Sequence, residues 1–256
     1  MSIKRRTPDD EPFYLIRTLA AGYGPGASIQ DHTHSWRQLI FSPKGVMSVS
    51  TAQGTWIVPP HWAVWVPSGV THSIRFSGEA SMRTIYVRPR LGRRLPTVCR
   101  VIRVSPLLRE LILRAQSIGM LDRREPAHRR LAELILDEFR EQEVAPLELP
   151  MPRDPAARRL ADCLCERPNE PVSLDELARR CGAARRTLER RFVEETGITL
   201  GRWRQHARLF HALRRLAAGD AVQMAGMQAG YNSVSAFIAS FRGAFGATPG
   251  RYFNSS

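Results

Sequence analysis

Three histidines have the residue type and the spacing of a metal site. His32 and His34 are separated by one residue in GASIQDHTHSWRQLIF, and His72 ends the turn-like segment VPSGVTH. Because alternate residues of a β-strand point to the same side, a strand here would present His32 and His34 to one cavity. Neutral imidazole binds zinc, nickel, copper and iron. Any one of these histidines alone would be interpreted as a polar residue at a sheet edge, but a pair that faces one cavity has the geometry that a divalent transition metal needs.

Short strands are the elements that must position these histidines. Between Phe13 and Pro89, apolar or alternating runs are broken by glycine and proline about every eight to twelve residues, which is typical of an antiparallel sandwich or small barrel. The periodicity becomes helical after Pro89. Ser105 and Pro106 fit the N-cap and first residue of one helix, and the stretch EPAHRRLAELILDEFREQE predicts another.

A proline-rich segment follows the predicted helices. The stretch APLELPMPRDP contains four prolines, which cannot sustain a helix. We therefore expect the α+β class, with an antiparallel β-barrel and following helices over 1–145, a linker at 146–154, and an all-α domain over 155–256.

The all-α part contains an internal repeat. Six positions recur after 49 residues with identical or similar side chains. They are Leu188, Phe192, Gly197, Thr199, Gly201 and Trp203, which recur as Phe237, Phe241, Gly246, Thr248, Gly250 and Tyr252. Each copy outlines a helix that stops at glycine, and Ser173 with Glu176 gives the capping-box pattern of a shorter helix before the first copy. Two short helices joined by a tight turn are typical of a helix-turn-helix, whose second helix enters the major groove.

The net charge of +14 agrees with a nucleic-acid partner, because a basic surface attracts polyanions. The alternative for each helix pair is a helical hairpin with a solvated arginine face, which the duplication and the charge together disfavour. A hydrophobic content of 43% and a charged content of 24% indicate ordinary globular domains. In the absence of a signal-peptide core and of an apolar run of about eighteen residues, we expect a cytoplasmic protein with no membrane partner.

Residues 155–253 resemble the DNA-binding domain of the AraC/XylS family of transcription regulators. The stretch RLFHALRRLAAGD resembles the helix that connects two helix-turn-helix units in this family, and AGYNSVSAFIASFRGAFGATPGRYF resembles the second unit. The resemblance implies that double-stranded DNA is the partner and that the two recognition helices enter successive major grooves.

The same resemblance assigns DNA contacts to both units. In the first unit, the base-reading positions of the family fall on Arg186, Glu189 and Arg190, with Arg185 and Arg191 as phosphate contacts. The second unit offers hydrogen-bonding side chains only at Ser233 and Ser235 and at nearby Arg242, although Val234 could touch a thymine methyl. We therefore expect the second unit to position the protein more than to discriminate bases.

Residues 26–45 resemble the first cupin motif, in which Gly26, His32, His34 and Gly45 match and Gln38 stands in place of an acid. The stretch PSGVTH resembles the core of the second motif, with a histidine at position 61 where glycine is expected. The resemblance adds Gln38 to the candidate metal ligands. Since a neutral amide contributes less to a divalent ion than a carboxylate, the alternatives are a weaker three-histidine site and a former metal site lined for an organic ligand.

Cupin barrels precede the DNA-binding domain in many members of this family. The resemblance implies that a small-molecule or metal effector enters the barrel, that the following helices pair two chains into a homodimer, and that RNA polymerase is a partner if the protein activates transcription. Trp36, Trp56 and Trp65, with Gln38, are the candidate lining of the effector pocket.

We predict that the chain is not an enzyme. It lacks the nucleophile-elbow, P-loop and dinucleotide fingerprints, and no carboxylate base is expected beside the histidines. A cupin metalloenzyme fused to a DNA-binding module and a constitutive DNA-binding protein remain the alternatives to an effector-responsive regulator.

Overall fold

The computed structural model of the protein describes residues 11–91, 95–145, 147–170 and 172–254. The chain divides into two compact units, of which the first comprises Met1–Thr51 and Trp56–Glu148 and the second comprises Ala52–Thr55 and Leu149–Ser256. The main division therefore falls inside the segment 146–154. That segment also contributes the short strand β12 (Glu148–Pro150).

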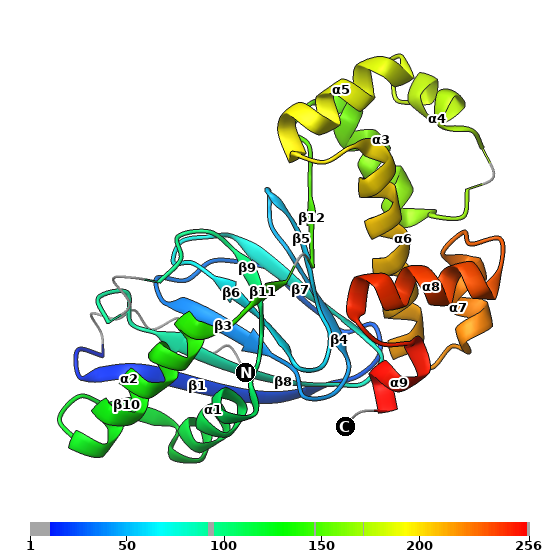
Figure 1. Ribbon diagram of the computed structural model, residues 1–256. Coiled ribbons are helices and arrows are strands. Elements are labelled where there is room, and N and C mark those ends of the chain that lie inside the picture. The colour runs from blue at the N-terminus through cyan, green and yellow to red at the C-terminus, as the bar shows by residue number, and fades with distance from the viewer. Residues whose placement is uncertain (1–10, 92–94, 146, 171, 255–256) are drawn as a thin grey trace. The chain divides into compact units, whose positions relative to one another are not determined.

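Two sheets with antiparallel neighbours lie mainly in the first unit (Figure 1), although most of β12 and the start of β5 (Gly54–Val58) belong to the second. One sheet has the strand order β10 (Met120–Asp122), β1 (Tyr14–Tyr23), β8 (Ala80–Val87), β3 (Arg37–Phe41), β6 (Trp62–Val66), β9 (Arg100–Arg103) and β11 (Val144–Ala145). The other has the order β12, β5, β4 (Val46–Ser50), β7 (His72–Ser77) and β2 (Ser28–His32). The sheets meet through side chains, since the rings of Tyr23 on β1 and Phe76 on β7 stack with centroids 4.0 Å apart.

One face of the seven-stranded sheet is covered by two helices, α1 (Pro106–Ile118) and α2 (Pro126–Glu141). Leu39, Trp65 and Ile85 from the sheet form one buried cluster with apolar residues of both helices. Each fully buried aliphatic or aromatic side chain of this kind contributes about 1.5–3 kcal/mol to folding. Because strand residues alternate between faces, Gln38, the neighbour of Leu39, points to the other side of the sheet.

Helix α1 begins as the sequence predicts. The Ser105 hydroxyl accepts a hydrogen bond of 3.0 Å from the backbone N–H of Leu108, and Pro106 is the first helical residue. These features satisfy orphan groups of the first turn. The expected order of antiparallel strands, helices and an all-α second part is confirmed.

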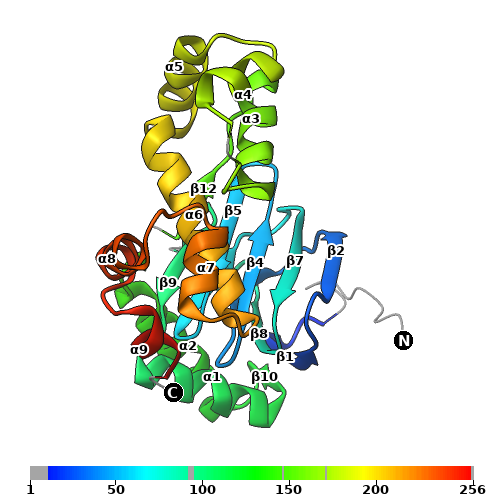
Figure 2. The same ribbon diagram turned by 90° about the vertical axis from the view of Figure 1, so that its right-hand side faces the viewer.

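The second unit consists mainly of helices (Figure 2). They are α3 (Pro155–Glu166), α4 (Leu174–Arg180), α5 (Arg185–Thr196), α6 (Leu200–Ala217), α7 (Val222–Gln228), α8 (Val234–Phe245) and α9 (Pro249–Asn254). Helix α6 joins two short helix pairs, α4 with α5 and α7 with α8. Its 18 residues span about 27 Å at 1.5 Å per residue.

The two helix pairs are copies that differ by one residue in the turn. Helices α4 and α7 begin 48 residues apart, whereas α5 and α8 begin 49 residues apart, so the second turn is one residue longer. Gly197 and Gly246 end the two longer helices, both with φ of 75°, a left-handed conformation that glycine adopts without steric cost.

The two helix pairs fill the space between their helices with different side chains, and a larger side chain on one helix is matched by a smaller one on the other. In the first pair, buried Ala178 on α4 and Leu188 on α5 hold the positions that Gly226 on α7 and Phe237 on α8 hold in the second. A Cβ atom on Gly226 would lie only 2.8 Å from the Phe237 ring. The larger ring of the second copy therefore requires glycine on the facing helix, since close-packed interiors do not absorb an extra methyl without strain.

We expect Gly226→Ala to destabilise the second unit by about 1–3 kcal/mol, the usual cost of overpacking a core. Calorimetric melting of the full chain measures the effect. The double variant Gly226→Ala with Phe237→Leu recreates the pairing of the first copy and should recover most of the loss. A Gly226→Ala protein that melts like the wild type would contradict the close approach of α7 and α8.

Candidate ligand site and DNA interface

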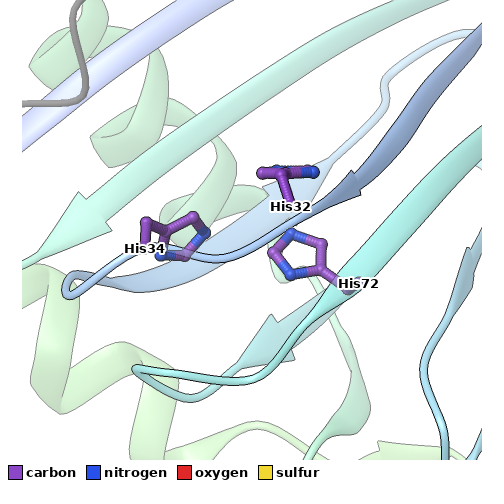
Figure 3. Close-up of side chains that lie close together, drawn as sticks. All are labelled: His32, His34 and His72. Atoms are coloured by element: carbon purple, nitrogen blue, oxygen red, sulfur yellow. The ribbon is translucent and has the colours of Figure 1, made fainter.

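Three histidine rings meet in the first unit (Figure 3). One nitrogen from each of His32, His34 and His72 lies within 4.8 Å of the nitrogens from the other two. The ring centroids are 4.3 Å apart for His32 and His72, 5.2 Å for His34 and His72, and 5.9 Å for His32 and His34. The structure thus brings together the three histidines that the sequence spacing singled out.

The elements that carry the three histidines differ in part from the expected ones. His32 is the last residue of β2 and pairs directly with His72 on β7. His34 lies beyond β2, in the connection to β3, so the prediction that His32 and His34 share one strand is wrong. The irregular connection carries the His34 ring to the other two.

Backbone carbonyls orient all three rings through the same nitrogen. The Nδ1 atoms of His32, His34 and His72 lie 2.9, 2.6 and 2.9 Å from the carbonyl oxygens of Gln30, Trp36 and Val70. Because a carbonyl oxygen can only accept a hydrogen bond, each Nδ1 carries the proton. In the neutral ring the lone pair is then on Nε2, which is the tautomer selected by this kind of partner in metal sites.

Gln38 closes the cluster from β3. Its Oε1 atom lies 2.8 Å from Nε2 of His34 and 3.1 Å from Nε2 of His72, and its side chain is buried. The Gln38 Nε2 atom donates to the Tyr86 hydroxyl at 3.2 Å. The amide oxygen therefore faces two of the three histidine rings.

Tyr86 is a member of this site that the sequence did not reveal. It pairs with Gln38 in the register of β8 and β3, and its ring meets the His34 ring edge-on with centroids 5.3 Å apart. The alternating pattern of SMRTIYVRP could have placed it on an inward face, but the partner strand is 48 residues distant, and strand register is not a local property.

Burial keeps the His34 and His72 rings neutral. It lowers the pKa of the His72 imidazole to about 4, and it also lowers the pKa of His34 from the usual histidine value. The positive charge on a neighbouring histidine would lower both pKa values further. Both rings are therefore uncharged at neutral pH, the form in which imidazole is a metal ligand.

The predicted aromatic pocket is corrected in part. Trp36, Trp56 and Trp65 are each only 1% exposed. Trp65 pairs with Leu39 and packs in the core under α1 and α2, so it points away from the face that carries Gln38. The prediction failed for Trp65 because it relied on nearness to the histidine motifs along the chain. It did not consider which face of the strand carries the side chain.

Trp36 and Trp56 have different surroundings. The guanidinium groups of Arg17 and Arg88 lie 5.7 and 5.6 Å from the centroid of the Trp36 ring. The Trp36 carbonyl accepts a hydrogen bond from His34. Trp56 is on β5, which β4 separates from β7 and His72. Of these three tryptophans, Trp36 is the one whose backbone carbonyl accepts a hydrogen bond from the cluster, through His34.

Helix α5 presents the predicted charged residues of the first DNA-binding unit. Arg186 and Arg190 are exposed. The Arg185 guanidinium donates to Glu189 at 2.8 Å and to Asp175 at 3.3 Å. Exposed ion pairs of this kind are weak, so Arg185 can exchange them for a phosphate.

Arg191 differs from these residues because it is half-buried and faces the acids Asp154 and Glu194, each at 3.9 Å. Its guanidinium is thus placed beside the start of α3.

Helix α8 presents a different surface. Ser235 and Arg242 are exposed and border a shallow depression with Ile238, Ala239, Gly243 and Thr248. Ser233 is the N-cap of α8, and its hydroxyl accepts a hydrogen bond of 3.2 Å from the Ala236 N–H. Ser233 therefore has a structural role in addition to the predicted DNA contact.

A β unit that carries a side-chain cluster, followed by a helical unit with two helix-turn-helix pairs, is the arrangement of a DNA-binding regulator with a separate ligand domain. Residues 16–179 match the family model described as AraC-like ligand binding domain, and residues 177–255 match the model described as helix-turn-helix domain. The chain belongs to the AraC family of transcription regulators.

Individual relatives agree with this assignment. The chain is 36% identical over 221 residues to the HTH-type transcriptional regulator NimR of Escherichia coli K12, covering 86% of this chain and 81% of the relative. It is 32% identical over 103 residues to RipA of Corynebacterium glutamicum, covering 40% of this chain and 31% of that regulator.

A solved structure of ToxT from Vibrio cholerae with a bound unsaturated fatty acid aligns with 93% of this chain and 95% of its own, at 10% identity and a TM-score of 0.39.

The comparisons confirm two predictions from the sequence. The protein is a DNA-binding transcription regulator with a ligand-binding domain, and its families and relatives are regulators and not enzymes. Among the described residues, no helix combines the length and the apolar character needed to cross a membrane.

We expect Arg190→Ala to reduce discrimination between operator and random DNA by about 1–3 kcal/mol, because an exposed arginine on α5 can bind the guanine edge in two places. Arg185→Ala should weaken binding to operator and random DNA alike. It should also reduce the slope of log affinity against log salt concentration by about one. Fluorescence anisotropy titrations at several salt concentrations measure both quantities. Equal operator preference in the Arg190→Ala and wild-type proteins would show that α5 does not read bases through this residue.

Proposed function

We propose that this regulator senses a divalent transition metal through His32, His34, His72 and Gln38, and that metal binding changes its affinity for operator DNA. The observation that carries the proposal is the common orientation of the three rings. Each Nδ1 is held by a backbone carbonyl, which leaves the Nε2 lone pair of each ring free for a metal. One nitrogen from each ring lies within 4.8 Å of the nitrogens from the other two.

The chemistry of the donor set supports a transition metal over calcium or magnesium. Three neutral imidazoles suit zinc, copper, nickel or iron, whereas the harder cations prefer oxygen ligands. The Gln38 amide oxygen would supply a weak fourth ligand.

Converging lone pairs repel one another in the absence of a donor. A cation would remove that repulsion. Without one, the Gln38 amide would turn its NH2 group toward the Nε2 atoms, which the amide oxygen faces in the structure. A metal would therefore replace the hydrogen bonds of Gln38, which gives the site two distinct states.

We expect the wild-type protein to retain about one zinc, nickel, copper or iron(II) ion per chain after incubation and gel filtration. The double variant His32→Ala with His34→Ala should lose that ion, because one imidazole and one amide do not hold a divalent metal. Elemental analysis measures the metal content. DNA affinity of the metal-free double variant should stay close to that of metal-free wild type, since the helical unit has its own core.

His61→Gly is the matched control, since it removes an exposed imidazole outside the cluster. His61 has a φ of 69°, a conformation that glycine adopts more readily, so this change should not unfold the unit. Retention of metal by the double variant, or its absence from wild type with every tested ion, would overturn the metal proposal. An organic effector that still shifts DNA binding would then be the ligand of this domain.

We also propose that α2 pairs two chains into a homodimer. Leu134 is 43% exposed at the middle of its outer face. Exposed Arg130 lies one turn before it, and exposed Asp137 and Glu141 lie one and two turns after it. A second α2 packed antiparallel about Leu134 would set basic against acidic ends on both sides, which is the self-complementarity of a two-fold interface.

We expect Leu134→Asp to convert the dimer to a monomer in analytical ultracentrifugation, because it adds an acid to the centre of the interface. The matched control is Leu107→Asp, which places the same charge on the exposed part of α1. Arg130→Glu should weaken the dimer, and adding Asp137→Arg should restore it, since position 130 of one helix would lie beside position 137 of the other. A wild-type monomer at micromolar concentration, or a dimer that persists in Leu134→Asp, would place the interface elsewhere or remove it.

A further inference from the structure

Helices α5 and α8 present equivalent faces with opposite chemistry. Both end at a left-handed glycine and bury equivalent pairs, Leu188 with Phe192 and Phe237 with Phe241. The repeat offset of 49 residues therefore relates their exposed positions as well. The base-reading positions of α5, Arg186, Glu189 and Arg190, correspond to Ser235, Ile238 and Ala239.

One face of α8 carries only small side chains along its length. Ser235, Ala239 and Gly243 follow one another at four-residue intervals, so they lie along one side of the helix. With Ile238, Arg242 and Thr248 they border a depression of about 700 Å³. The depression lets another surface come close to the helix axis, with an isoleucine at its margin.

DNA is the occupant that the observations favour. The helix belongs to the helix-turn-helix domain of a DNA-binding family, and exposed Arg242 borders the same depression where it can meet a phosphate. In the major groove, the 5-methyl of thymine is the apolar group that a base edge offers. Ile238 and Ala239 have no side-chain donor or acceptor, so this methyl is the feature that they can recognise.

We propose that α8 selects thymines in its half of the operator through methyl contacts made by Ile238 and Ala239. The two helix-turn-helix units then discriminate bases by different means, α5 by charged hydrogen bonds and α8 by apolar contact. This goes beyond the expectation that the second unit positions the protein more than it discriminates bases, and it assigns the discrimination to Ile238 and Ala239. The inference rests on the DNA-binding activity of the family and is independent of the metal proposal.

Uracil in place of thymine tests the proposal without altering the protein. The operator is first selected from random DNA with the full chain, and hydroxyl-radical footprints with and without Arg190→Ala assign one half-site to α5. Thymines are then replaced singly by uracil, which removes only the methyl group. We expect a loss of about fourfold in affinity for each contacted methyl in the α8 half-site. Replacements in the α5 half-site should have no such effect.

A double-mutant cycle ties the effect to the side chain. Ile238→Ala should bind the thymine operator more weakly than wild type, and it should lose its sensitivity to uracil at the position that Ile238 contacts. Met227→Ala, which shortens another exposed apolar side chain of the same unit, is the matched control and should keep that sensitivity. Wild-type affinity that is unchanged by uracil at every α8 half-site thymine would overturn the proposal, even though the protein still binds DNA.

Discussion

The alternation of side chains along β3 is the constraint on which the first unit depends. Leu39 belongs to the apolar core under α1 and α2, and its neighbour Gln38 must therefore point to the opposite face. A shift of one residue in register would bury the amide among leucines and expose the core. The hydrophobic packing of the sheet on its helices thus fixes the position of the polar group that closes the histidine cluster.

The same constraint gives the site its rigidity. His72 is fixed by pairing with His32 across β7 and β2, and Gln38 and Tyr86 are fixed by pairing across β3 and β8. Side chains on paired strands are more precisely placed than side chains on loops. His34 is the exception, because it lies in a connection and depends on the hydrogen bond from its ring to the Trp36 carbonyl.

The helical unit shows how duplicated modules diverge without losing their packing. In the interior, the second copy has Gly226 and Phe237 where the first has Ala178 and Leu188. The smaller residue makes room for the larger ring, because close-packed helices tolerate changes that keep the total side-chain volume. The exposed faces have no such requirement, and their chemistry has separated into a charged and an apolar surface. A regulator with unlike units suits an asymmetric operator, since each recognition helix contacts its own groove segment.

Local patterns in the sequence determined much of this protein. Ser105, Ser173 and the repeat from Leu188 to Tyr252 depend on caps, turns and helical periodicity, which act within a few residues, and the predicted helices are present. The three histidines were also found, although the supposed single strand ends at His32. Only the tertiary structure decided that Tyr86 joins Gln38 and that Trp65 faces away from it. Both facts depend on the register between strands far apart in the chain, and register is set by the packing of the whole sheet and not by any local run of residues.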